Sequence, residues 1–100
     1  MDGARAPLAQ PVVRNIVSTP EFDREVEALG GARAIDDALS PFVEALSHNP
    51  YGFEKFEADG FSFRWVITHE TIMTPPLAIV FRIELSEPYD VVLEHIEERP

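Results

Sequence analysis

The spacing of apolar residues divides the chain into a helical half and a strand half. Between Thr19 and Ser47 apolar residues recur every three or four positions, as they do on one face of an α-helix. After Pro50 they alternate with polar residues, which is typical of half-buried strands. Helices followed by a run of strands predict an α+β domain, with an antiparallel sheet and a helical hairpin packed on one face of it.

The first helix has clear start and stop signals. Thr19 can cap the free amides of the first turn, and Pro20 suits the first helical position. Gly30 and Gly31 end this helix, because glycine adopts the left-handed conformation of a helix C-terminus without strain. The pair of glycines therefore predicts the joint of a helical hairpin.

The second helix is expected at residues 32–47. Pro41 lies inside it and removes one backbone hydrogen bond, which predicts a kink or a split with Ser40 as a new cap. Asn49-Pro50 marks the exit, because a residue before proline avoids the helical region.

Four strands are expected in the second half, at residues 53–58, 61–68, 77–85 and 89–96. The first two are separated by Asp59-Gly60, a favoured two-residue hairpin turn. The third has the strongest alternation and is expected in the centre of the sheet. A further short strand is expected before the helices, at residues 12–17.

One strand carries four large apolar residues at every second position, with Val66 as the exception to the alternation. This aromatic stripe consists of Phe61, Phe63, Trp65 and Ile67. We expect it to face the apolar sides of the helices, so that Trp65 lies at the rim of the core with a partner for its indole N–H. The alternative for Trp65 is an exposed interface anchor.

Composition limits the chain to one domain. Its 100 residues, 45% of them hydrophobic, suffice for one core, expected at residues 12–100 after a tail at residues 1–11. No apolar run reaches the roughly 18 to 20 residues of a membrane span, and the start lacks the apolar stretch of a signal peptide. A cytoplasmic protein without membrane association is expected. There is no cysteine, hence no disulfide and no thiolate site.

The net charge is strongly negative. Eighteen acidic residues stand against eight basic ones, giving −10, and the basic residues are scattered along the chain without forming a stripe. Such a chain repels phosphate backbones, and nucleic-acid binding needs local cations to displace counterions. The acidity is consistent with simple solubility, or with a basic partner surface or DNA mimicry.

The order of elements and several local motifs resemble one known family. Asn49-Pro50 stands at a helix exit, Glu54-Lys55-Phe56 opens the hairpins, and the segments at residues 78–84 and 91–93 match its later strands. Over residues 12–98 the chain resembles the RelE/ParE superfamily of bacterial type II toxins. The resemblance implies a RelE/ParE-like sheet with two helices, and a toxin that an antitoxin wraps with a helix or an extended segment.

The charges depart from those of the messenger-RNA-cleaving members of this family. Such members are basic, because cleavage activates a 2′-OH and stabilises charge on a phosphate. Here Ala78 holds the position of an arginine that opens a family strand, and Glu97-Glu98 replaces a basic run. These differences argue against a messenger-RNA nuclease and favour action through protein binding.

Three basic residues remain as catalytic candidates, should the chain be a ribonuclease. They are Lys55, Arg64 and Arg82, which could form a basic patch if they share a face of the sheet. The alternative is that they pair with Glu57 or Glu84 on a solvated face.

The other polar residues predict no cofactor and no metal. His48, His69 and His95 have no ligand spacing, and the neighbours Asp36 and Asp37 diverge by about 100° on a helix. The leading hypothesis is a toxin-like protein that binds an antitoxin. A non-toxic binding module of the same fold and a residual ribonuclease stay open, as does a homodimer formed by edge strands.

Overall fold

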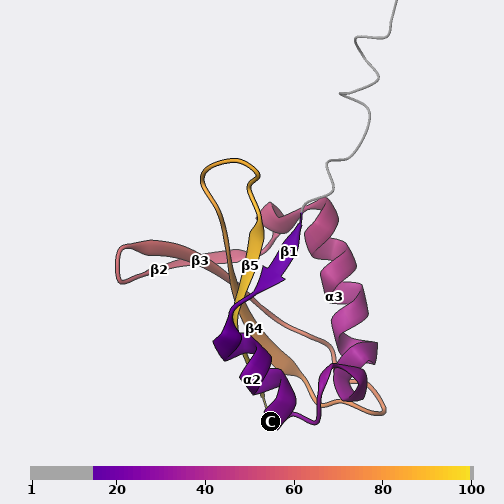
Figure 1. Ribbon diagram of the computed structural model, residues 1–100. Helices are drawn as coiled ribbons and strands as arrows, with labels where there is room; N and C mark the ends of the chain where they lie inside the picture. The colour runs from indigo at the N-terminus through magenta and orange to yellow at the C-terminus, as the bar shows by residue number, and fades with distance from the viewer. Residues whose placement is uncertain (1–14, 100) are drawn as a thin grey trace, which may run out of the picture.

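The computed structural model describes residues 15–99, which form a five-stranded sheet with two α-helices on one side (Figure 1). The α+β class is thereby confirmed. The tail expected at residues 1–11 and the start of the strand expected at residues 12–17 lie outside the described residues. In chain order the elements are β1 (Ile16–Ser18), α2 (Pro20–Ala28), the 3₁₀ helix η2 (Ala32–Ile35), α3 (Asp36–His48), the 3₁₀ helix η3 (Pro50–Gly52), β2 (Glu54–Ala58), β3 (Phe61–Ile67), β4 (Leu77–Ile83) and β5 (Val91–Glu98).

The sheet is mixed. Its strand order is β1-β5-β4-β3-β2, so β4 is the central strand as predicted. The pairs β2–β3, β3–β4 and β4–β5 are antiparallel, but β1 runs parallel to β5, with Ile16 opposite Val91. The prediction of a wholly antiparallel sheet is therefore wrong for this pair. A parallel pair needs a long connection, which the helices and the three intervening strands provide.

The helical joint forms as the sequence predicts. The Oγ1 atom of Thr19 accepts a hydrogen bond from the backbone N–H of Phe22 at 3.1 Å, and Pro20 is the first helical residue. Gly30 and Gly31 follow α2 with φ values of 105° and 94°, a conformation that favours glycine.

The second helix breaks at a different place from the predicted one. A 3₁₀ turn gives way to α3 at Asp36, and α3 then continues through Pro41. The predicted split with Ser40 as a cap is wrong: the Ser40 hydroxyl donates to the Asp36 carboxylate at 3.1 Å instead. Pro41 lies near the start of α3, so the hydrogen bond that it removes belongs to the carbonyl of Asp37 in the first turn.

The core lies between the helices and one face of the sheet, called here the covered face. Phe42 of α3, Phe53 and Phe81 of β4 meet edge to face, with ring centroids 5.6 to 6.0 Å apart. The buried core residues are Phe22, Val26, Ile35, Ala38, Phe42, Leu46, Leu77, Ile79, Phe81, Val91, Leu93 and Ile96.

The aromatic stripe faces away from this core, contrary to the prediction. In the β3–β4 register Val66 lies opposite Ile79, and Trp65 lies opposite Val80. Ile79 is fully buried on the covered face, and opposed residues of a sheet share a face. Val66, the exception in the sequence pattern, therefore faces the helices. Trp65 and the rest of the stripe face the opposite side, called here the open face.

The two edges of the sheet differ. Beyond its pairing with β1, β5 is bordered by α2, where Glu25 accepts a hydrogen bond from the N–H of Ile96 at 2.9 Å. The β2–β3 hairpin instead projects beyond the helices (Figure 1). Its turn is the predicted one, with positive φ at Asp59 (52°) and Gly60 (82°).

Candidate interaction surface

The open face carries a continuous apolar patch. Three adjacent strands supply it, because Phe56 of β2 lies opposite Phe63 of β3, and Trp65 of β3 lies opposite Val80 of β4. The apolar patch consists of Phe56, Phe61, Phe63, Trp65, Ile67, Ala78 and Val80. No helix of residues 15–99 packs on it, since α2 and α3 contribute to the core on the covered face.

The large side chains of the patch are in contact with solvent. Phe61 is 62% exposed, Ile67 41% and Trp65 38%, whereas Leu77, Ile79 and Phe81 of the neighbouring β4 are fully buried. The rings of Phe56 and Phe63 stack at 5.6 Å, and Phe61 lies 6.4 Å from Phe63. Single exposed apolar residues are ordinary, whereas a contiguous apolar patch makes the open face a candidate interaction surface.

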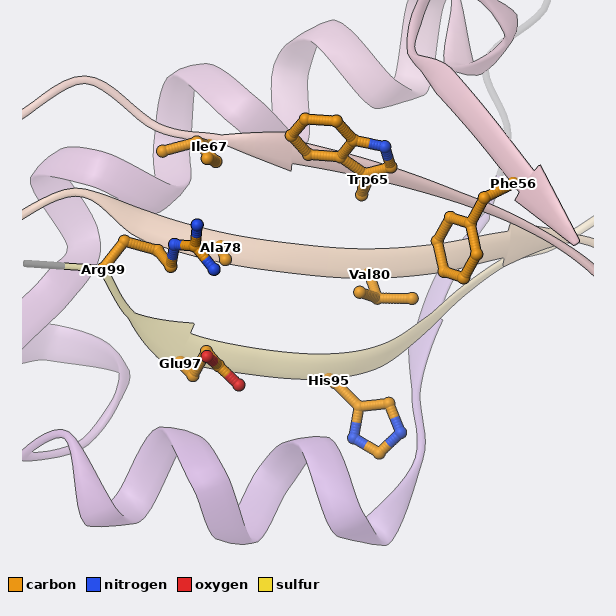
Figure 2. Close-up of a pocket in the computed structure, with 8 residues that line it drawn as sticks. All are labelled: Phe56, Trp65, Ile67, Ala78, Val80, His95, Glu97 and Arg99. Atoms are coloured by element: carbon orange, nitrogen blue, oxygen red, sulfur yellow. The ribbon is translucent and has the colours of Figure 1, made fainter. Parts of the chain in front are cut away.

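A groove crosses the patch. It has a volume of about 370 Å³, and Figure 2 shows its eight lining side chains gathered over neighbouring strands. The floor is apolar, with Trp65, Ile67 and Val80 among the lining residues, and His95, Glu97 and Arg99 stand at its β5 side. The groove can therefore accept an apolar side chain flanked by a polar or charged one.

Carboxylates outnumber cations around the patch. The charged residues on or beside the open face are Glu54, Glu84, Glu94, Glu97, Arg82 and Arg99. Arg82 is already neutralised: its Nε donates to Glu94 at 2.6 Å, and its Nη1 lies 3.6 Å from Glu84. The His95 ring lies 3.4 Å from Glu25 of α2, where that carboxylate borders β5.

Two of the three catalytic candidates are neighbours, and the third lies on the other face of the sheet. Lys55 lies opposite Arg64 in the β2–β3 register, so both point to the side of the helices. Arg64 lies opposite Phe81, a covered-face residue, and Arg82 is the next residue along β4, so Arg82 points to the open face. Their catalytic role stays a prediction, and no single basic patch contains all three.

Arg64 stabilises the fold on the covered side of the sheet. Its guanidinium donates hydrogen bonds to the carbonyls of Phe53 at 2.8 Å and Tyr51 at 3.1 Å, and it lies 5.3 Å from the centre of the Tyr51 ring. These contacts tie β3 to η3. They also let a polar residue occupy a position on the covered side of β3, so that the stripe takes the other face.

Asp37 fastens the loop before β4 to α3. Its carboxylate accepts hydrogen bonds from the hydroxyls of Thr71 and Thr74, the latter at 2.7 Å. Thr74 is buried, whereas Asp37 itself is exposed. The hydrogen bonds from Thr71 and then Thr74 lower the pKa of the Asp37 carboxyl below its ordinary value. Asp37 therefore has a structural role, which is to hold the loop before β4 against α3.

The sequence pattern does not reveal the apolar patch, because the same alternation of apolar residues is typical of a strand whose apolar side faces the core. The available signal was the conflict within residues 61–68: Val66 breaks the alternation, and the strand at residues 77–85 offers an apolar stripe of its own. Two apolar stripes on adjacent strands can lie on opposite faces, and only the register decides which one meets the helices.

Comparisons of the chain with family models, with curated proteins and with solved structures gave no match. Within residues 15–99, no helix combines the length and the apolar character that crossing a membrane requires. The same residues contain no group of three or more histidines and carboxylates placed to hold a metal ion.

Proposed function

We propose that this chain is a protein-interaction module whose working surface is the open face. The observation that carries the proposal is the apolar patch, a set of aromatic and aliphatic side chains that three strands align and no described helix covers. Exposed Trp and Phe side chains in a groove are typical anchors of protein interfaces, because they bury a large area with little loss of conformational freedom.

The partner that we propose is an antitoxin, with the chain acting as a toxin-like protein. This part rests on the resemblance to the RelE/ParE superfamily and on the order of helices and strands. Arg82 lies on the opposite face from Lys55 and Arg64 and is paired with Glu84 and Glu94, and the Arg64 guanidinium is bound to backbone carbonyls. This arrangement supports protein binding over phosphate chemistry, since a developing phosphate charge needs converging cations.

Co-expression with the product of the adjacent reading frame tests the proposal. We expect a complex whose affinity, measured by isothermal titration calorimetry, falls about thirtyfold or more in Trp65→Ser, as for a central anchor. The matched control is Val43→Ser, which removes an apolar side chain of similar exposure, 37%, from α3. Equal affinities for Trp65→Ser and the native chain would contradict the assignment of the open face.

Expression in a bacterial host without that product tests the toxin-like part. Growth arrest that the adjacent product relieves is the expected result. No complex with that product, together with unaltered growth, would contradict the toxin-like part.

A further inference from the structure

We infer that the open face accepts a cationic amphipathic helix, whose apolar side lies on the patch and whose Lys or Arg residues reach the carboxylates around it. This inference rests on the proposed function and names the partner chemistry of the same surface. Three properties of the molecule carry it: the layering of the sheet, the length of the patch and the sign of the charge.

The arrangement of layers in the fold favours a helix as the partner of the open face. A sheet that is apolar on both faces buries them by stacking another layer on each, and helices are the layer already used on the covered face. On the open face, β3 is apolar from Phe61 to Ile67 and β4 is apolar at Ala78 and Val80, with Arg82 beyond them, and this face lacks a second layer within residues 15–99. An amphipathic helix laid in an apolar groove is also a recurrent form of peptide recognition.

The dimensions match a short helix. β3 has seven residues, and at about 3.3 Å per residue the patch extends for roughly 20 Å along the strand. A helix rises about 1.5 Å per residue, so about 13 residues cover that length. The groove beside Trp65 and Val80 would then take one apolar side chain near the middle of such a helix.

The charge selects a cationic partner over a second copy of the chain. Around the patch, four carboxylates stand against two guanidinium groups, and Arg82 is engaged by Glu84 and Glu94. Glu97 lines the groove, and Glu54 lies opposite Trp65 at its β2 side. Two chains of net charge −10 repel each other, whereas Lys and Arg residues are steered towards this face.

The experiment uses two synthetic peptides of about 18 residues, five helical turns. The first has leucines on one side of the helix and lysines on the other, and the second has glutamate in place of every lysine. Neither contains tryptophan, so emission reports on Trp65, the only tryptophan of the chain. Binding to the full chain is followed by the anisotropy of a dye on the peptide and by the emission of Trp65.

We expect the lysine peptide to bind, to shift the Trp65 emission to shorter wavelength and to lose affinity as salt rises. The glutamate peptide is expected to show no binding. Glu97→Lys and Glu54→Lys are each expected to weaken binding about tenfold, the effect of reversing one charge beside the bound helix. Glu44→Lys is the matched control, because it changes the net charge equally on α3, away from the open face.

Three outcomes would overturn the inference: equal binding of both peptides, an unchanged Trp65 emission on binding, or equal weakening by Glu44→Lys and Glu97→Lys. Failure of the lysine peptide, combined with a native complex that Trp65→Ser disrupts, would leave the proposed function standing and refute only the cationic chemistry. A native complex indifferent to Trp65→Ser would refute the proposed function itself. Circular dichroism of each variant confirms that it is folded.

Discussion

The two faces of the sheet carry similar side chains in different surroundings. On the covered face, Leu77, Ile79 and Phe81 are fully buried beneath the helices. On the open face, Phe61, Trp65 and Ile67 are between 38% and 62% exposed. The difference shows that apolar content alone does not define a core. One face stabilises the fold, and we propose that the other is available for binding.

Truncation of a phenylalanine on the covered face is the largest expected effect. Phe81→Ala leaves a cavity among Phe42, Phe53 and the other core residues, so it should lower the free energy of unfolding by about 3–5 kcal/mol. Urea denaturation followed by circular dichroism measures the loss. A loss of less than about 1 kcal/mol would contradict the placement of β4 against the helices.

The pH dependence of stability that Asp37 causes is the intermediate effect. Asp37 lies on α3, one of the helices that cover the sheet. Because the hydrogen bonds of Thr71 and Thr74 lower its folded pKa, the charged carboxylate stabilises the fold above about pH 4, its ordinary pKa. That stabilisation is lost as the pH falls through the lower folded pKa. Asp37→Asn should therefore flatten part of the acid limb of the melting temperature against pH.

Comparison with Asp36→Asn provides the control, because Asp36 is the neighbouring exposed carboxylate and accepts only from Ser40 among the described side chains. An acid limb that is identical in Asp37→Asn and the native chain would show that Asp37 does not hold the loop.

Truncation on the open face is the smallest expected effect on stability. Phe61→Ala removes the same side chain as Phe81→Ala but from a position that is 62% exposed. The loss should stay below about 1 kcal/mol, the worth of a cross-strand pair. The same urea titration measures it. Equal losses of unfolding free energy for Phe61→Ala and Phe81→Ala would mean that Phe61 is buried in the free chain, which would contradict the exposure of the open face.

The sequence was informative about elements because their boundaries depend on local chemistry. Thr19 as a cap, Gly30-Gly31 as a joint and Asp59-Gly60 as a turn act within a few residues, and each stands where it was predicted. The predicted split at Pro41 was wrong, because a proline breaks a helix only when it lies well beyond the first turn. Where α3 begins could not be predicted, since it follows a 3₁₀ turn and has no capping side chain.

The arrangement of the sheet depended on contacts between distant residues. The parallel pairing of β1 with β5 joins the two ends of the described chain and has no local signal. The face taken by the aromatic stripe is set by a register in which a slip of one residue exchanges the two faces. Arg64, predicted as a catalytic candidate, binds two backbone carbonyls that its sequence neighbours do not identify.

The most direct test of the open face as a binding surface is acrylamide quenching of Trp65 fluorescence, free and bound. The partner is the product of the adjacent reading frame, with its tryptophans replaced by phenylalanine, so that Trp65 alone reports. We expect ready quenching in the free chain, because Trp65 is 38% exposed, and protection in the complex. A tryptophan shielded in the free chain, or quenched equally in both states, would contradict this expectation.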